Sequence, residues 1–371
     1  MPALFVYGSL RDRPLLDIVL GHGGAQVCAA TLPDHKVSWA DGQVFPFIEA
    51  ASGASAEGLL LRGLSEADVA RLDFYEGGFG YDLRRVEVFA NGAQSAEVYF
   101  PRPGLWTGGA PFVLADWQAT YGPLSRHAAC EAMGYFGRFT GEELAAKMPM
   151  IRARAAAQLL AHGVPHEVRS QTPARAVEVL AEETPHAGFF VTKALTLRHP
   201  KFDGQLTEPL RREVFVSTDA AIVLPYDPVR DRVLLIEQFR MGPFGRGDPY
   251  PWMLEPVAGR VDPAETPEQA AHRECAEEAG LTLTGLEAIA SYYCSPGVVT
   301  EYFHTYLGLA DLPDDLPRLG GLETEAEDIR LHLMSFERAH ALIGTGEADN
   351  GPLILALMWL ARERPRLRAA A

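Results

Sequence analysis

Short apolar stretches, several of them alternating with polar residues, recur in both halves of the chain and are bounded by glycine, proline, asparagine or aspartate. This pattern predicts β-strands, and the Asn91-Gly92 pair between two of them predicts a β-hairpin. Elsewhere apolar residues recur three or four positions apart, which is the period of an amphipathic helix. We expect strands at 4–8, 57–64, 81–90, 93–100, 189–199, 212–227 and 231–240, and helices at 13–21, 65–77, 141–163 and 266–279.

The order of these elements suggests more than one domain. A chain of 371 residues is long for a single compact core, and its length favours two or three domains. We expect a small α+β unit over 1–112, a helical connector over 113–184 and an α/β unit over 185–371. The predicted fold class is therefore α/β and α+β in two domains.

The charge balance argues against some classes of partner. The chain has 33 Lys and Arg residues against 49 Asp and Glu residues, and a net charge of -16 opposes binding to nucleic acid or to an anionic membrane. The apolar run at 352–361 is too short to span a bilayer, and the first residues lack the basic region of a signal peptide. Four cysteines without a CxxC pair are typical of a reducing compartment. We therefore expect a cytoplasmic protein that binds neither nucleic acid nor a membrane.

The stretch GRVDPAETPEQAAHRECAEEAGL at 259–281 crowds five glutamates into and around one predicted helix. Glu274 and Glu278 are four residues apart, so they lie on a common face of that helix, with Glu277 beside them. Like charges at this spacing repel, and a hard cation such as Mg²⁺ or Mn²⁺ would offset the repulsion. The alternative is a solvated helix face with ordinary charge pairing.

The polar positions of this stretch resemble the Nudix box of the Nudix hydrolase family. The resemblance implies an α/β/α sandwich that hydrolyses a nucleoside diphosphate linked to another moiety. It also implies that Glu274 and Glu278 are the principal metal ligands, that Glu277 shares the cluster and that the Ala258 carbonyl completes it. The metal would activate a water and neutralise the diphosphate, while Arg273 would orient the glutamates.

The flanks of the box narrow the substrate. The segments EPVAGRVDPAET, SYYCSPGVVTEYFHTYLG and EDIRLH resemble the ADP-ribose pyrophosphatase branch of the family. The resemblance implies hydrolysis of ADP-ribose to AMP and ribose 5-phosphate, with Glu301, which follows the SPG motif, in the substrate site. Another nucleoside diphosphate sugar is the alternative substrate. The segment 189–215 commonly forms strands that cross to a partner subunit in this family, so a homodimer is expected.

The acidic loop ETEAED supplies candidates for handling the attacking water, since a metal-bound water needs a proton acceptor or a positioning carboxylate. Glu323, Glu325 and Glu327 are the candidates, and the resemblance favours Glu325 or Glu327. The alternative is a solvated loop. Arg212 and Arg240 could bind phosphate or stack on adenine, because a guanidinium offers a planar fork and a flat face. Either arginine could instead be a surface ion-pair partner.

Two motifs stand out in the first unit, FVYGSL at 5–10 and LDFYEG at 72–77. Together they resemble the gamma-glutamylcyclotransferase-like (AIG2-like) family, which implies a small mixed β-barrel. By that resemblance Tyr7, Gly8, Ser9 and Leu10 would bind the substrate. Glu76 would shuttle a proton while the substrate's α-amine attacks its own γ-carbonyl and releases 5-oxoproline.

Two alternatives apply to the first unit. It could be an active cyclotransferase whose Nudix domain serves as a nucleotide sensor, or it could be an inactive regulatory or dimerising domain, because fold alone does not guarantee activity. The combination of the two domains is also similar to Nudix proteins associated with tellurite resistance, which names a phenotype and no reaction.

Overall fold

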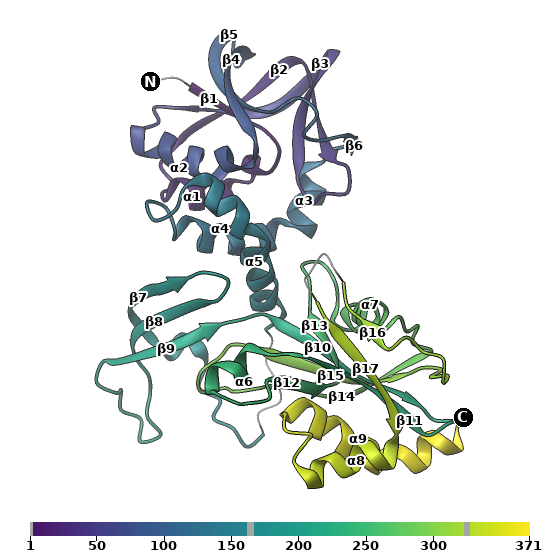
Figure 1. Cartoon of the computed structure of the whole chain (residues 1–371). Helices are drawn as coiled ribbons and strands as arrows, with labels where there is room; N and C mark the ends of the chain where they lie inside the picture. Colours follow the sequence, from purple (N-terminus) through teal and green to yellow (C-terminus); the bar gives the residue numbers. More distant parts are fainter. Residues whose placement is uncertain (1–2, 162–166, 323–326) are drawn as a thin grey trace. The chain divides into compact units, whose positions relative to one another are not determined.

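The computed structural model describes residues 3–161, 167–322 and 327–371. The chain divides into two compact units, Met1–His162 and Gly163–Ala371, and each is described by itself (Figure 1). Among the described residues no helix is both long enough and apolar enough to cross a membrane.

Five strands close into a barrel in the first unit. Their order is β3-β1-β5-β4-β2, and β2 pairs again with β3 to complete the ring, while β6 extends the sheet beside β2 (Figure 1). The β1–β5 pair is parallel and the other pairs are antiparallel, so the mixed barrel predicted from the sequence is confirmed. Phe5, Leu60 and Val98 are fully buried in its core. The strands are β1 (Ala3–Val6), β2 (Gln26–Ala40), β3 (Pro46–Arg62), β4 (Tyr81–Phe89), β5 (Ala93–Pro101) and β6 (Gly108–Pro111).

The helices of the first unit include three that follow the barrel in sequence. Asp12, buried at the start of α1, accepts hydrogen bonds from Arg126 of α4 at 2.7 and 2.8 Å. Trp117 of α3 and Ile151 of α5 are also buried. The helices are α1 (Arg13–Leu20), α2 (Glu66–Glu76), α3 (Leu114–Thr120), α4 (Gly122–Met133) and α5 (Gly141–Leu160), with 3₁₀ turns η1 (Gly8–Arg11) and η2 (Gly77–Phe79).

The region expected to be a helical connector, 113–184, therefore has a different organisation. Its helices belong to the first compact unit, which ends at His162. Residues 178–187 form a strand, β7, and do not continue the helical pattern. The reason is tertiary: α3, α4 and α5 bury apolar side chains beside α1, α2 and η2, which their sequence spacing alone does not reveal.

The second unit is a mixed sheet of eight strands between helices, which confirms the predicted α/β/α sandwich. The strand order is β14-β15-β10-β11-β17-β16, with β12 paired to β11 and β13 paired to β10. Helix α7 packs against β10 and β13, whereas α8 and α9 cover the opposite face (Figure 1). The strands are β10 (Asp219–Asp227), β11 (Arg232–Phe239), β12 (Trp252–Glu255), β13 (Val257–Arg260), β14 (Gly285–Tyr293), β15 (Tyr302–Leu309), β16 (Leu319–Gly320) and β17 (Ile329–Ser335), and the helices are α6 (Met241–Arg246), α7 (Pro267–Ala279), α8 (Phe336–Thr345) and α9 (Gly351–Ala369).

A separate three-stranded sheet precedes the sandwich. It consists of β7 (Glu178–Ala187), β8 (Val191–Arg198) and β9 (Leu210–Val216), preceded by the 3₁₀ turn η3 (Ala174–Ala176). Several of its apolar side chains are exposed, including Phe189, Phe190 and Phe215. The homodimer expected for this segment stays a prediction.

Candidate functional site

Helix α7 presents the glutamates because its two ends are fixed by local chemistry. Thr266 and Gln269 form a capping box, in which each side chain accepts a hydrogen bond from the other residue's backbone N–H. Pro267 occupies the first turn, and Gly280 ends the helix in the left-handed conformation, with φ of 63°. The helix thus begins and ends where the sequence predicted.

Gly259 on β13 gives Glu274 the room it needs. A Cβ atom on Gly259 would lie 1.8 Å from Glu274 Oε1 and 1.9 Å from its Cδ. The carboxylate of α7 therefore lies directly against the backbone of β13. This close approach explains why the first position of the motif is a glycine.

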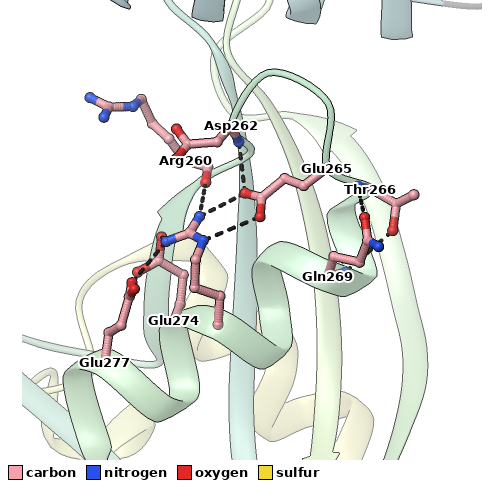
Figure 2. Close-up of polar contacts among 8 residues, drawn as sticks. Arg260, Asp262, Glu265, Thr266, Gln269, Glu274 and Glu277 are labelled. Atoms are coloured by element: carbon pink, nitrogen blue, oxygen red, sulfur yellow. Dashed lines mark hydrogen bonds and ion pairs between the residues drawn. The ribbon is translucent and has the colours of Figure 1, made fainter. Parts of the chain in front are cut away.

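Arg273 bonds Glu274 and Glu277 of α7 and Glu265 of the preceding loop, which are labelled in Figure 2. Its guanidinium bonds Glu265 Oε1 at 2.7 Å, Glu274 Oε1 at 2.7 Å and Glu277 Oε2 at 2.9 Å, and it also donates to the Arg260 carbonyl at 2.9 Å. These bonds to carboxylates raise the pKa of Arg273 above its usual range. The structure thus shows Arg273 holding the glutamates in place.

Glu274 and Glu278 are buried on the inner face of α7. Burial raises the pKa of Glu274 to about 7, against the opposing effect of Arg273. Burial also raises the pKa of Glu278 to about 8, although Glu278 accepts a hydrogen bond from the Ala258 N–H at 3.1 Å. The charge of Glu274 raises the pKa of Glu278 further, so a cation bound between the two carboxylates would relieve their repulsion.

The donor set fits a divalent cation. Glu274, Glu277 and Glu278 together with the Ala258 backbone offer only oxygen ligands, which Mg²⁺ and Mn²⁺ prefer. In the part of the chain that the structure describes, no three acidic, His or Cys side chains already stand close enough to hold an ion. Arg273 bonds one oxygen of Glu274 and one oxygen of Glu277, which leaves the second oxygen of each carboxylate outside these ion pairs.

Of the acidic loop, Glu327 lies within the described residues. A Cβ atom on Gly320 would lie 1.8 Å from the Glu278 carbonyl oxygen, and one on Gly321 would lie 2.8 Å from Glu327 Cβ, so the fold brings Glu327 close to α7. Its charge raises the pKa of both Glu274 and Glu278. One Glu327 oxygen accepts the Leu322 N–H at 3.2 Å. The other two predicted candidates, Glu323 and Glu325, lie outside the described residues.

The predicted substrate-binding residues of this unit are not all equally close to the glutamates. Arg240 bonds Glu255, which lies three residues before Ala258, and its charge lowers the pKa of Glu278. Arg212 is exposed on β9 and donates to the Arg211 carbonyl at 3.2 Å. Glu301 accepts bonds from Ser217 Oγ at 3.2 Å and Cys294 Sγ at 3.4 Å, and no bond joins it to the glutamates of α7.

Sequence reasoning missed Glu255, the partner of Arg240. Glu255 Oε2 accepts a hydrogen bond from Arg240 Nε at 2.7 Å. The two residues are 15 positions apart and meet because β11 and β12 form a hairpin, with Ile236 opposite Glu255. The register of the β11–β12 hairpin could have identified Glu255, because it determines which residues of the two strands lie opposite one another.

The first unit has a small pocket of its own, with a volume of about 40 Å³. It unites the two motifs read from the sequence, because Tyr7, Ser9 and Leu10 line it together with Glu76. Gly8, with φ of 61°, lies against the ring of Pro46 at this turn. The sequence missed Tyr99, which arrives from β5. The lining residues are Phe5, Val6, Tyr7, Ser9, Leu10, Pro46, Glu76, Tyr81 and Tyr99.

Glu76 has no cationic neighbour among the residues that line the pocket. Burial raises its pKa to about 7, so near neutral pH the carboxyl can both give and take a proton. Burial also raises the pKa of Tyr7 well above its usual range, and the charge of Glu76 adds to that effect. The pocket therefore combines tyrosine hydroxyls with one poised carboxyl group.

The second unit thus has the architecture of a metal-dependent hydrolase: a three-layer sandwich with buried carboxylates on one helix. The NUDIX domain family matches residues 216–357, and the family described as "Gamma-glutamyl cyclotransferase, AIG2-like" matches residues 4–119. The chain belongs to the Nudix hydrolase family, whose members generally require a divalent metal, and it carries an AIG2-like gamma-glutamyl cyclotransferase domain in its first unit.

Curated relatives agree with this assignment. The ADP-ribose pyrophosphatase of Escherichia coli (strain K12) is 40% identical over 184 residues, which are 50% of this chain and 87% of that protein. The ADP-ribose pyrophosphatase of Haemophilus influenzae is 36% identical over 186 residues, covering 50% and 85% of the two chains. The GDP-mannose pyrophosphatase of Enterobacter sp. (strain 638) is 29% identical over 184 residues, covering 50% and 94%.

Proposed function

We propose that the second unit hydrolyses the diphosphate of ADP-ribose to AMP and ribose 5-phosphate, with Mg²⁺ as the metal. The observation that carries the proposal is the buried pair of carboxylates, Glu274 and Glu278, beside the Ala258 peptide. A hard divalent ion offsets the repulsion of such a pair. The relatives named ADP-ribose pyrophosphatase support the choice of substrate, since they are more similar to this chain than the GDP-mannose pyrophosphatase is.

The protein's part in this reaction is to position charge. A bound divalent ion would activate a water and offset charge on the diphosphate oxygens. Arg273 fixes the side chains of Glu274 and Glu277, and the Ala258 N–H fixes that of Glu278, so the oxygens that would hold the ion are preorganised. Arg240, near Glu278, supplies a guanidinium fork that matches phosphate oxygens.

A substrate and metal panel tests the proposal. The purified full chain is incubated separately with ADP-ribose and GDP-mannose, each with Mg²⁺, Mn²⁺ or EDTA, and the nucleotide products are separated by chromatography. We expect AMP from ADP-ribose with a kcat/KM at least about tenfold above that for GDP-mannose, as direct contacts to the base and sugar would give. Equal or reversed values would contradict ADP-ribose as the substrate.

We propose that Glu327 or Glu325 handles the attacking water. Glu327→Gln is expected to lower kcat for ADP-ribose about 100-fold with little change in KM, because general-base and positioning carboxylates act in the transition state. Steady-state kinetics measure both constants. Asp328→Asn, at the exposed neighbouring position, is the control and should retain kcat within about twofold. If Glu327→Gln and Asp328→Asn lower kcat to the same extent, the role proposed for Glu327 is wrong.

The first unit supports a second candidate function, release of 5-oxoproline from γ-glutamyl amines. The observation that favours it is Glu76, buried in a pocket with Tyr7, Tyr81 and Tyr99 and poised to transfer protons near neutral pH. In this reaction the substrate's α-amine forms a bond to its own γ-carbonyl carbon, and the leaving amine departs with a proton. Glu76 would carry that proton from the attacking amine to the leaving amine.

Glu76→Gln is expected to lower 5-oxoproline release at least about 100-fold while ADP-ribose hydrolysis stays at the wild-type rate, since the amide cannot transfer protons. Liquid chromatography of 5-oxoproline formed from a γ-glutamyl dipeptide and from γ-glutamyl-lysine measures the first reaction. Glu66→Gln, exposed at the start of the same helix, is the matched control and should keep full activity. Release that survives in Glu76→Gln, or that wild type never shows, would refute this function.

A further inference from the structure

The guanidinium of Arg240 is held from one side only. Its Nε donates to Glu255 Oε2 at 2.7 Å. Within residues 3–161, 167–322 and 327–371 no acceptor bonds the two terminal nitrogens of Arg240. The Arg240 side chain is 39% exposed, whereas Glu255 is 18% exposed. The free edge of the guanidinium therefore carries a pair of N–H groups, the arrangement that fits two phosphate oxygens.

The strand that carries Glu255, the partner of Arg240, leads directly into β13, which packs against α7. The positive charge of Arg240 also lowers the pKa of Glu278. Glu255 ends β12, and Ala258 follows three residues later on β13. The same stretch of backbone thus places both the carboxylate that bonds Arg240 and the peptide that bonds Glu278.

The strand that carries Glu255 is also bonded to the N-terminal cap of α9. Asn350 caps α9 by accepting the Leu353 N–H at 3.0 Å, and its Nδ2 donates to the Leu254 carbonyl at 2.6 Å. The strand that holds Glu255 is therefore tied to the start of α9. This support limits where the Glu255 carboxylate, and with it the Arg240 guanidinium, can move.

Glu255 is mostly buried, and keeping its carboxylate ionised beside Arg240 costs folding free energy. Burial raises the pKa of Glu255, and the nearby charge of Asp349 adds to that effect, whereas Arg240 opposes it. Replacing such a pair with apolar residues is often neutral or stabilising. The bond between Glu255 and Arg240 is therefore better explained by the orientation that it gives the Arg240 guanidinium than by a contribution to folding stability.

We propose that Glu255 is a positioning residue of the Nudix site. It bonds Nε of Arg240 and thereby turns the two terminal nitrogens toward the diphosphate of a bound nucleotide. This inference rests on the proposed function, because it takes a nucleoside diphosphate as the ligand. Glu255 itself does not touch the substrate.

The test is a double-mutant cycle in which ADP binding and the kinetics of ADP-ribose hydrolysis are both measured. Isothermal titration calorimetry of ADP with Mg²⁺ is compared for wild type, Glu255→Gln, Arg240→Ala and the double variant of the full chain. We expect Glu255→Gln to weaken ADP binding about tenfold, because a misplaced guanidinium loses most of its benefit. The double variant should bind no more weakly than Arg240→Ala alone. In ADP-ribose hydrolysis, KM should rise while kcat changes less than about threefold.

Glu237→Gln is the matched control. Glu237 is on β11, the strand paired with β12, and bonds His332 Nε2 at 2.8 Å and Arg330 at 3.3 Å. It lies opposite Leu254, on the other face of the sheet from Glu255. This variant removes a similar carboxylate and should leave ADP affinity and KM unchanged. A loss of thermal stability in Glu255→Gln beyond that of Glu237→Gln would indicate a structural role and overturn the proposal.

The outcomes separate this inference from the proposed function. If Glu255→Gln and Arg240→Ala weaken ADP binding without additivity and ADP-ribose is not hydrolysed by wild type, the positioning role stands and the substrate assignment fails. If wild type hydrolyses ADP-ribose but the two substitutions act additively, or act on kcat alone, the positioning role fails.

Discussion

Glu278→Gln is expected to reduce ADP-ribose hydrolysis about 1,000-fold or more, because the amide loses the charge that a divalent ion requires. Glu278 is almost completely buried, and its carboxylate accepts the Ala258 N–H at 3.1 Å. Glutamine has the same shape and can keep that hydrogen bond through its own oxygen. The loss should therefore arise from the missing charge and not from a displaced side chain. Steady-state kinetics with saturating Mg²⁺ measure it.

The stability of the same variant identifies the cause of the loss. Burial and the neighbouring charges of Glu274 and Glu327 disfavour ionised Glu278 in the metal-free protein. Removing this charge should leave the free energy of unfolding unchanged or increase it, as judged by urea denaturation in EDTA. Added Mg²⁺ should stabilise wild type and not Glu278→Gln. An inactive variant that is also much less stable would point to misfolding instead.

Gly259→Ala is expected to lower kcat/KM about 100-fold, because the new methyl group would displace the carboxylate of Glu274 and a shift of about 1 Å in a catalytic group has an effect of this size. The Cβ atom would lie 1.8 Å from Glu274 Oε1, far inside contact distance. We also expect a loss of about 1 to 3 kcal/mol in the free energy of unfolding from overpacking. Kinetics and urea denaturation measure the two effects.

Gly344→Ala is the control for this substitution. Gly344 lies in α8, and a Cβ atom there would have no neighbour within 4 Å. Alanine should be tolerated or slightly stabilising at this position, since it has a higher helix propensity than glycine. If Gly259→Ala kept wild-type activity, the close approach between β13 and Glu274 would not matter for function.

The parts of the site that follow from local sequence could be predicted. Glu277 and Glu278 lie three and four residues after Glu274 on a helix, and the caps at Thr266 and Gly280 set where that helix begins and ends. Helical geometry alone then places the carboxylates together.

The parts that depend on distant segments could not be predicted from local patterns. Glu255 meets Arg240 through a hairpin register, and Tyr99 reaches the pocket of Glu76 from another strand of the barrel. Helix α5 resembles a connector in sequence, yet Ile151 is buried and Arg154 pairs with Glu131 of α4 at 2.5 Å. Such contacts depend on tertiary packing, which the pattern of a single segment does not predict.

The most direct test of the central claim is the dependence of AMP release on metal and on Glu274. Wild type and Glu274→Gln are incubated with ADP-ribose over a titration of Mg²⁺, with EDTA as the zero point, and AMP is quantified over time. We predict equimolar AMP and ribose 5-phosphate from wild type with Mg²⁺, none with EDTA, and a rate at least about 1,000-fold lower from Glu274→Gln. AMP formed at the wild-type rate in EDTA, or by Glu274→Gln, would contradict the account.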